Sequence, residues 1–303
     1  MDKLITIFTP TYNRAYTIHK CYESLKRQTS KDFVWLIIDD GSTDKPYEII
    51  KEWIKINNGF EIRYVYKENG GMHTAHNTAY ENIDTELNVC VDSDDYMPDN
   101  AVQLIIDCWN KNKNKGYAGI IALDFADSTK KVIGKELPTD KESTTLMGYY
   151  NNGGFGDKKL IYRTDIIKQT PPYPVFNNEK YVALAYKYHL IDEKYELKIL
   201  NECVCIVDYQ MDGSSTNMYR QYVRNPKGFA FWRKEQMKHS INTKQKINAC
   251  IHYVSSSLIA KNKHFIKESP EKFLTVLSIP LGFLLKIIVV KKSKSSYMKV
   301  EGI

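Results

Sequence analysis

Short apolar runs and amphipathic stretches take turns over roughly the first 110 residues. Four mostly apolar runs predict buried strands, at Leu4–Phe8, Phe33–Ile38, Ile62–Tyr66 and Leu87–Val91. Between and after them, apolar residues recur at the three- and four-residue spacing of helices, as at Ile18, Cys21, Tyr22 and Leu25. Apolar strands that alternate with amphipathic helices predict an α/β fold with a mostly parallel sheet covered on both faces.

Polar clusters follow each of these predicted strands. They occupy Thr9–Arg14, Asp39–Asp44, Lys67–His73 and Asp92–Asp95. Ligands of mostly parallel sheets bind outside the carboxyl ends of the strands. One polar turn would be unremarkable, but four of them at successive strand ends predict a binding site along one edge of the sheet.

The last cluster holds three carboxylates within four residues, at Asp92, Asp94 and Asp95. Such groups repel one another unless a cation lies among them, and hard ions such as Mg²⁺ or Mn²⁺ prefer oxygen ligands. On an extended chain Asp92 and Asp94 face the same side, so both can reach one ligand. A metal bound here would take its remaining ligands from substrate phosphates. The alternative is a solvated acidic turn that caps the next helix.

The middle of the chain, residues 117–220, has a less regular pattern. Strands are expected at Ile120–Leu123, Leu160–Tyr162, Leu197–Leu200 and Cys203–Val207. The rigid turn Pro171–Pro174 is expected to deliver Asn178 and Glu179 to the start of a helix that continues through Tyr188. A polar loop is expected over 210–217.

Charge divides the chain unevenly. Residues 221–303 contain 16 Lys and Arg against 4 Asp and Glu, a net charge of +12, whereas residues 1–220 have a net charge of −5. The apolar run Phe273–Val290 is of about membrane-spanning length, but Pro280, Gly282 and Lys286 interrupt it. We therefore expect a helical, basic C-terminal region that lies on a membrane surface. An ordinary packed helix and a true span are the alternatives.

Other sequence features bear on location and partners. Met1–Ile5 lacks the basic and long apolar regions of a secretory signal. The six cysteines form no CxxC pair, so structural zinc is not expected and reduced thiols are. Nucleic acid is not an expected partner, because the aromatics of the basic region lie within apolar runs. The sequence thus favours a cytoplasmic protein, peripheral on the inner face of the cell membrane.

Several motifs together support a family assignment. In chain order they are Pro10–Arg14, Gln28-Thr29, Asp39–Asp44, Asn69–Gly71, Ala75–Asn77 and Asp92–Asp95. This series closely resembles the family 2 nucleotide-sugar glycosyltransferases with the GT-A fold. The resemblance covers residues 4 to about 110, and continues more loosely through Phe176–Lys180 and Asp212–Ser215.

The resemblance implies a donor site for a nucleotide sugar, which we expect to be UDP-linked. Tyr12 would pack against the nucleobase with support from Pro10 and Thr11, and Asp40 would accept a hydrogen bond from uracil N3–H. Arg14 would meet phosphate. The alternatives are a corner-filling tyrosine, an aspartate that caps a turn, and a surface ion pair. The remaining residues of the implied donor site are Asn69, Gly70, His73, Asn77, Asp92 and Ser93.

The resemblance also implies metal and catalytic residues. Asp94 would bind Mn²⁺ or Mg²⁺ at the donor diphosphate, with Asp92 and Asp95 as further candidate ligands. Glu179 would be the general base that takes the proton of the acceptor hydroxyl in an inverting transfer. Related enzymes often carry Glu-Asp here, whereas this chain has Asn178-Glu179-Lys180. The alternative for Glu179 is a glutamate that stabilises the first turn of a helix.

The sequence leaves the roles of two histidines in the Gly70–Asn77 segment open. His73 and His76 are compatible with contacts to diphosphate or sugar, and equally with the core or the surface. Similar sequences often have Lys where Met72 stands, so a phosphate contact is absent there.

The expected protein is therefore an inverting glycosyltransferase that moves a sugar to a glycan or lipid-linked glycan in surface polysaccharide synthesis. A catalytic domain is expected over 1–220, with a nucleotide-binding half to 110 and an acceptor half from 111, followed by the helical region 221–303. The alternatives are transfer to a polyprenyl-phosphate lipid and a non-catalytic, membrane-bound assembly partner. A nucleotidyltransferase is less favoured, because it would need a Gly-rich, Lys- or Arg-bearing loop where Pro10–Arg14 stands. Oligomeric state is not predicted.

Overall fold

The computed structural model describes residues 3–210 and 218–300, and the side chains up to residue 294. The chain forms two compact units, each built from two segments. The first unit comprises 1–172 and 187–210, and the second comprises 173–186 and 211–303. This division differs from the expected boundary at residue 220, because residues 173–186 belong with the C-terminal helices.

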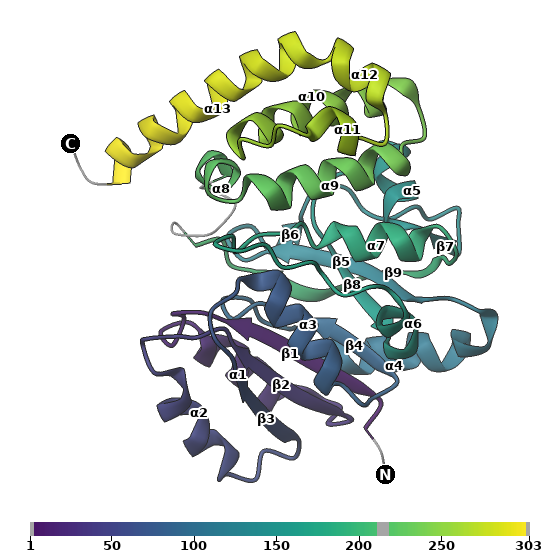
Figure 1. Cartoon of the computed structure of the whole chain (residues 1–303). Coiled ribbons are helices and arrows are strands. Elements are labelled where there is room, and N and C mark those ends of the chain that lie inside the picture. The colour runs from purple at the N-terminus through teal and green to yellow at the C-terminus, as the bar shows by residue number, and fades with distance from the viewer. Residues whose placement is uncertain (1–2, 211–217, 301–303) are drawn as a thin grey trace. The chain divides into compact units, whose positions relative to one another are not determined.

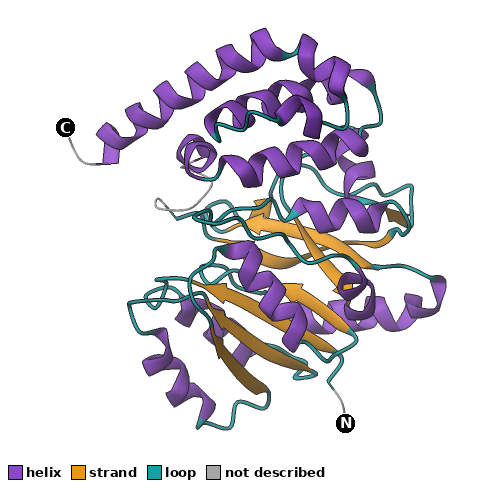
Figure 2. Ribbon diagram, viewed as in Figure 1, coloured by secondary structure: helices purple, strands orange, loops and turns teal. Residues whose placement is uncertain are grey.

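The first unit contains a nine-stranded sheet in the order β3-β2-β1-β4-β8-β5-β9-β7, with β6 paired to β5. Figure 2 shows its strands in orange between purple helices. Its strands are β1 (Ile5–Thr11), β2 (Phe33–Asp39), β3 (Glu61–Tyr66), β4 (Leu87–Cys90), β5 (Gly119–Ala126), β6 (Lys131–Val132), β7 (Ser143–Thr144), β8 (Lys158–Arg163) and β9 (Leu197–Val207). The first four strands are parallel neighbours, and β8 pairs antiparallel to both β4 and β5. The predicted mostly parallel α/β sheet is confirmed.

Helices alternate with the strands of the first unit, as Figure 1 shows. They are α1 (Ile18–Arg27), α2 (Pro46–Ile54), α3 (Met72–Asn82), α4 (Ala101–Asn112), η1 (Lys113–Lys115), α5 (Leu146–Asn151) and α6 (Thr164–Gln169), and α7 (Ala185–Asp192) crosses from the second unit into the first. Every residue of β1 and β2 is buried, because helices cover both faces of these central strands. Their continuous apolar sequences therefore form the core of the unit.

Two sequence expectations about local structure were wrong. The two strands expected between Leu197 and Val207 are one strand, β9, whose register with β5 shifts on either side of Leu123. The helix expected to start at Asn178 begins instead at Ala185. Residues ahead of it are held by long-range contacts, such as the hydrogen bond from Lys180 N to Asn225 Oδ1 (2.7 Å). The expected loop around 210–217 lies largely outside the described residues.

The C-terminal part of the second unit is helical in its described residues. It comprises α8 (Met218–Arg224), α9 (Pro226–Lys238), α10 (Thr243–Ile259), α11 (Phe265–Glu268), α12 (Lys272–Leu277) and α13 (Ile279–Val300). A buried cluster that includes Met237, Cys250 and Tyr253 joins α9 to α10. Across 3–210 and 218–300, no helix combines the length and the apolar character needed to cross a membrane.

Gly119 allows the close approach of β5 and β8. Its φ is +148°, and an added Cβ would lie 1.9 Å from the carbonyl oxygen of Ile161. We expect Gly119→Ala to lower the free energy of unfolding by more than about 3 kcal/mol, because backbone atoms must move apart. Gly116→Ala is the control, since φ is +77° there but no atom lies within 4 Å, and it should cost only about 1 kcal/mol. Urea unfolding of both variants tests this, and equal losses would contradict it.

Candidate functional site

The carboxyl ends of the first four strands lie at one edge of the sheet. Thr11, the last residue of β1, is in register with Asp39 at the end of β2, and Asp39 is in register with Tyr66 at the end of β3. On the other side of β1, Phe8 pairs with Cys90, the last residue of β4. The four polar clusters therefore follow neighbouring strand ends, as the sequence predicted.

Asp40 organises two of these clusters. Its Oδ1 accepts hydrogen bonds from Gly70 N (2.9 Å) and from the Lys67 ammonium, which also forms an ion pair with it. Its Oδ2 accepts from Gly71 N (2.7 Å) and Asn69 Nδ2 (3.2 Å). A carboxylate offers about four lone-pair positions, and protein donors occupy all four. Asp40 thus holds the Asn69–Gly71 loop in place with both carboxylate oxygens. Its expected hydrogen bond to the nucleobase stays a prediction.

Three side chains at this edge have buried polar atoms without a hydrogen-bond partner among the described residues. They are Thr11 Oγ1, Asn69 Oδ1 and both ring nitrogens of His73. Asn69 Nδ2 donates a hydrogen bond to Asp40 O (2.7 Å), and the backbone N–H of Asp40 donates to Thr11 O (2.9 Å). Buried polar atoms without partners are uncommon in folded proteins, and a hydroxyl, an amide oxygen and an imidazole match the donor and acceptor groups of a ligand.

Hydrogen bonds also join the loop after β1 to the loop after β2. Asn13 adopts a left-handed backbone (φ +53°), and its Oδ1 accepts hydrogen bonds from Thr43 N (2.8 Å) and the Thr43 hydroxyl. Asp44 accepts from Ala15 N (2.8 Å). Tyr12, next to Asn13, is 48% exposed, so its ring is free to pack against a ligand. Pro10 is buried within β1, where it supports this loop.

Burial alternates along the acidic cluster. Val91, Ser93 and Asp95 are buried, whereas Asp92 and Asp94 are partly exposed. The chain is not extended here as expected, because Asp95 N donates to Asp92 O (3.0 Å) and closes a turn, but Asp92 and Asp94 are the partly exposed acids and define the open side of the cluster. Burial, together with the neighbouring charge of Asp92, raises the pKa of Asp94, while the nearby guanidinium of Arg14 opposes the shift.

Asp95 faces the interior instead. Its Oδ1 accepts a hydrogen bond from Asp208 N (3.1 Å), and the Cys205 thiol lies 4.0 Å from its Oδ2. Burial raises the pKa of Asp95 to about 8, although the positive charge of Lys159 opposes the rise. Asp95 therefore does not lie on the open side with the other two acids, and its predicted metal role is not supported by this placement.

A buried cation lies behind the cluster. Lys159 Nζ lies 3.7 Å from Asp124 Oδ1, and both side chains are almost entirely buried. Burial raises the pKa of Asp124 to about 6. Neither Lys159 nor Lys67 was among the predicted site residues. The available signals were a lysine directly before the apolar run Leu160–Tyr162, and a lysine directly after β3.

The open side of the cluster fits a divalent cation. Across the part of the chain that the structure describes, no three His, Cys, Asp or Glu side chains form a metal-binding group. Two neighbouring carboxylates, of which Asp92 helps to raise the pKa of Asp94, nevertheless suit a hard cation that takes its other ligands from phosphate. Asp94 and Asp92 would hold it.

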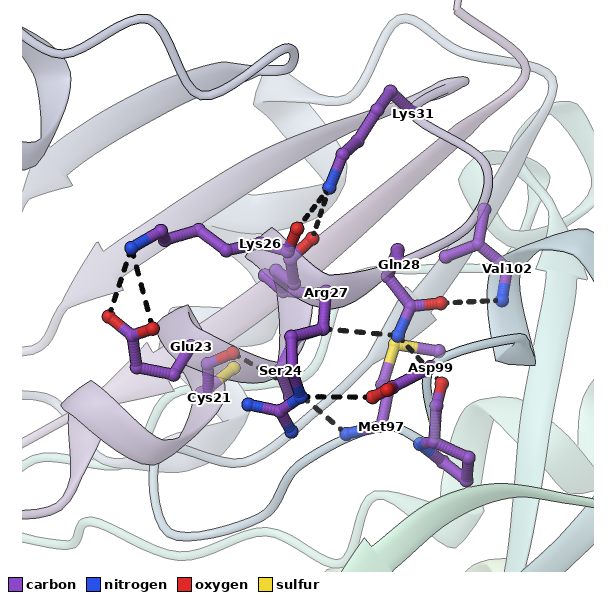
Figure 3. A network of polar contacts seen from close by, with 12 residues as sticks. Cys21, Glu23, Ser24, Lys26, Arg27, Gln28, Lys31, Met97, Asp99 and Val102 are labelled. Carbon is purple, nitrogen blue, oxygen red and sulfur yellow. Dashed lines mark hydrogen bonds and ion pairs between the residues drawn. The ribbon is translucent and has the colours of Figure 1, made fainter.

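Gln28 anchors the segment that follows the acidic cluster (Figure 3). Its side-chain amide donates to Pro98 O (2.7 Å), and its oxygen accepts from Val102 N (3.0 Å) at the start of α4. The Ser24 hydroxyl accepts from Met97 N (3.2 Å). The end of α1 therefore fixes the path of the chain just after Asp95.

The other predicted residues of this region have different placements. His76 is a core residue, since its ring packs edge-on against Phe8 and its Nδ1 lies 3.2 Å from the Tyr80 hydroxyl. Asn77 is half-buried on α3, and Ser93 is buried. The Arg14 guanidinium lies over the ring of Tyr16, 5.6 Å from its centroid.

Glu179 belongs to the second unit and is buried there. Its Oε1 accepts a hydrogen bond from Lys227 N (3.0 Å), and its Oε2 accepts from Gly228 N (2.9 Å). These amides are in the first turn of α9, where backbone N–H groups lack partners within the helix. Glu179 thus caps α9, rather than the first turn of its own helix. Its role as a base remains a prediction.

Two buried histidines make stability depend on pH. Burial lowers the pKa of His73 to about 4 and that of His76 to about 3. The unfolded chain therefore binds protons that the folded chain does not as pH falls below about 6.5, so the free energy of unfolding decreases there. Each histidine contributes a slope of up to about 1.4 kcal/mol per pH unit. We expect His76→Asn to have a shallower loss of stability between pH 7 and 5 than the wild type in urea titrations. Parallel curves would contradict this.

The fold defines the class of protein. The structure matches residues 1–349 of S. aureus TarS, solved in complex with UDP-GlcNAc, with a TM-score of 0.61 at 15% identity over 98% of this chain and 92% of that chain. It also matches the mannosyltransferase PcManGT from Pyrobaculum calidifontis, solved with GDP-Man and Mn²⁺, with a TM-score of 0.55 at 14% identity over 95% and 88% of the two chains. The fold is thus that of GT-A transferases, as expected.

The sequence then gives the family. The model of Glycosyl transferase family 2 matches residues 6–170, more than half of the chain, and the chain belongs to this family. Among relatives, Glycosyltransferase GlyA of Streptococcus pneumoniae is 34% identical over 105 residues, 35% of this chain and 15% of the relative. Chondroitin synthase of Escherichia coli is 35% identical over 157 residues, 52% of this chain and 21% of the relative. The chain therefore spans only a minor part of these relatives.

Proposed function

We propose that this protein transfers a sugar from a nucleotide donor to a hydroxyl group of a glycan, with inversion at the anomeric carbon. The observation that supports this most is the set of unpartnered polar atoms on Thr11, Asn69 and His73 at the strand ends around Asp40. A uracil ring offers one N–H donor between two carbonyl acceptors. Asn69 Oδ1 would accept from N3–H, and the Thr11 hydroxyl would donate to a carbonyl. Tyr12 would stack on the ring.

The chemistry follows from the acidic cluster and Glu179. The acceptor hydroxyl oxygen forms a bond to the anomeric carbon while the bond from that carbon to the diphosphate oxygen breaks. The nucleoside diphosphate leaves, and the hydroxyl proton passes to the Glu179 carboxylate. A divalent cation, Mn²⁺ or Mg²⁺, bound by Asp94 and Asp92 would offset the negative charge of the leaving diphosphate. Arg14 would add to this compensation.

Relatives support an acceptor in surface polysaccharide assembly. They include the chondroitin synthase above and the teichoic acid poly(glycerol phosphate) polymerase of Staphylococcus epidermidis, 35% identical over 111 residues, 36% of this chain and 15% of the relative. We propose a growing glycan as acceptor, lipid-linked and at the inner face of the cell membrane. Transfer to a polyprenyl phosphate is the second candidate, supported by the basic C-terminal region.

The test combines nucleotide binding with donor turnover. Thermal shift with Mn²⁺ and UDP, GDP or CDP should show the largest stabilisation with UDP, and UDP-sugars should release UDP. Thr11→Val removes the unpartnered hydroxyl at nearly constant volume, so it should weaken UDP binding about tenfold without lowering the melting temperature of the free protein. Absence of any nucleotide-dependent shift and of any diphosphate release would refute the proposal.

A further inference from the structure

Helices α12 and α13 have an inverted distribution of side chains. The buried residues of α12, α13 and the residue between them are Thr275, Ser278, Gly282, Val289 and Ser293, and only Val289 is a larger apolar residue. Their exposed positions hold large apolar residues, of which six are at least 50% exposed: Phe273, Leu277, Leu281, Phe283, Leu284 and Ile287. A helix at the surface of a water-soluble protein shows the opposite pattern.

The small residues allow close packing against α10. An added Cβ on Gly282 would lie 2.5 Å from the Val254 Cβ, so the two helices are nearly in backbone contact. Figure 1 shows α13 running along α10. Small residues between helices, with large apolar residues outside, are typical of helices packed in lipid. Since α10 covers one side of α13, lipid can reach only the other side.

Lysines continue the same exposed face. Leu277, Leu281, Leu284 and Ile288 follow one another at helical spacing, and Lys291 comes next on that line. Lys292 and Lys294 are also exposed. No acid among the described side chains forms an ion pair with these three lysines, and their positive charge complements an anionic lipid surface. A second copy of this face is less suitable, because it would offer apolar side chains and lysines but no carboxylate to pair with the lysines.

We propose that the exposed face of α12 and α13 binds an anionic phospholipid bilayer, with these helices parallel to the surface and their apolar side chains in the interfacial layer. This surface gives a structural basis to the membrane location in the proposed function. The binding itself does not depend on glycosyl transfer.

Vesicle sedimentation of the full chain tests the proposal. The wild type should sediment with vesicles of phosphatidylcholine and 30% phosphatidylglycerol, and much less with phosphatidylcholine alone. The double variant Phe283→Ser, Leu284→Ser should lower the partition coefficient by at least about tenfold, because two half-exposed apolar side chains lose their contact with lipid. Lys291→Gln with Lys294→Gln should lower it by about tenfold or more for anionic vesicles only.

The matched control is Ile241→Ser, which removes a 67% exposed apolar side chain from the loop between α9 and α10 of the same unit and should leave binding unchanged. Wild-type protein that stays in the supernatant, or equal losses in control and double variant, would overturn the proposal. A lipid-free dimer that the double variant converts to monomers would assign the face to a second copy instead. Release of UDP from the donor, measured without vesicles, reports separately on the proposed function.

Discussion

Asp94→Asn is expected to reduce release of UDP from the donor by at least about 100-fold while it raises the stability of the free protein. The loss of activity follows from the position of Asp94 on the open side of the acidic cluster, where charge stabilisation of a leaving group is worth about 10²–10³ in rate. The gain in stability has a different cause. The pKa of Asp94 is raised in the folded state by burial and by Asp92, so its charge opposes folding at neutral pH.

Asp99→Asn is the control for this experiment. Asp99 is an exposed acid of the same segment, and its side chain forms an ion pair with Arg27 (3.0 Å). Asp99→Asn should leave the rate of UDP release unchanged. It should change the free energy of unfolding by no more than about 1 kcal/mol. The measurement is UDP release over a series of Mn²⁺ concentrations, with thermal unfolding of the same samples. Full activity of Asp94→Asn at all metal concentrations would show that Asp94 is not part of the active site.

The second large effect concerns Glu179, whose cap and whose proposed chemistry can be separated. Glu179→Ala removes two hydrogen bonds to the first turn of α9 and should lower the free energy of unfolding by about 1–3 kcal/mol. If Glu179 is also the base, transfer to the acceptor should fall by at least about 100-fold in the folded protein at low temperature. Glu179→Gln should restore part of the stability and none of the transfer.

Asn242→Ala provides the comparison, because Asn242 caps α10 of the same unit by accepting a hydrogen bond from Gln245 N (2.9 Å). It should destabilise the protein by a similar amount without loss of transfer beyond that explained by unfolding. If Glu179→Ala and Asn242→Ala lost the same amounts of stability and of transfer activity, Glu179 would have a structural role only. Unfolding curves and transfer rates measured at the same temperature decide between these outcomes.

The sequence was sufficient to predict those parts of the fold that depend on residues close together along the chain. Strands β1–β4 and the polar clusters at their ends were predicted, because continuous apolar runs and the residues that follow them are neighbours along the chain. The partners of Asp40 were not predicted, since its four donors lie about 30 residues further on, in the loop that it holds.

Glu179 shows the same limit more strongly. Local pattern predicted a helix at Asn178, but the Glu179 carboxylate binds amides 48 and 49 residues away, and the chain just before it forms a single turn closed by Glu179 N and Phe176 O (3.0 Å). Lys159 was missed because a lysine in a strand is ordinarily an exposed residue. Its burial depends on Asp124, a residue of the neighbouring strand β5.

The discontinuous second unit also dictates an order of events during synthesis. Residues 173–186 leave the ribosome before β9 of the first unit and well before α9 of their own unit. Glu179 must therefore wait, without its partners, until Lys227 and Gly228 have been made. A chain synthesised only to about residue 220 contains every strand of the sheet but not α9, the helix that Glu179 caps. Residues 173–186 would then lack the C-terminal helices of their unit, and we expect proteases and chaperones to reach them until α9 has been made.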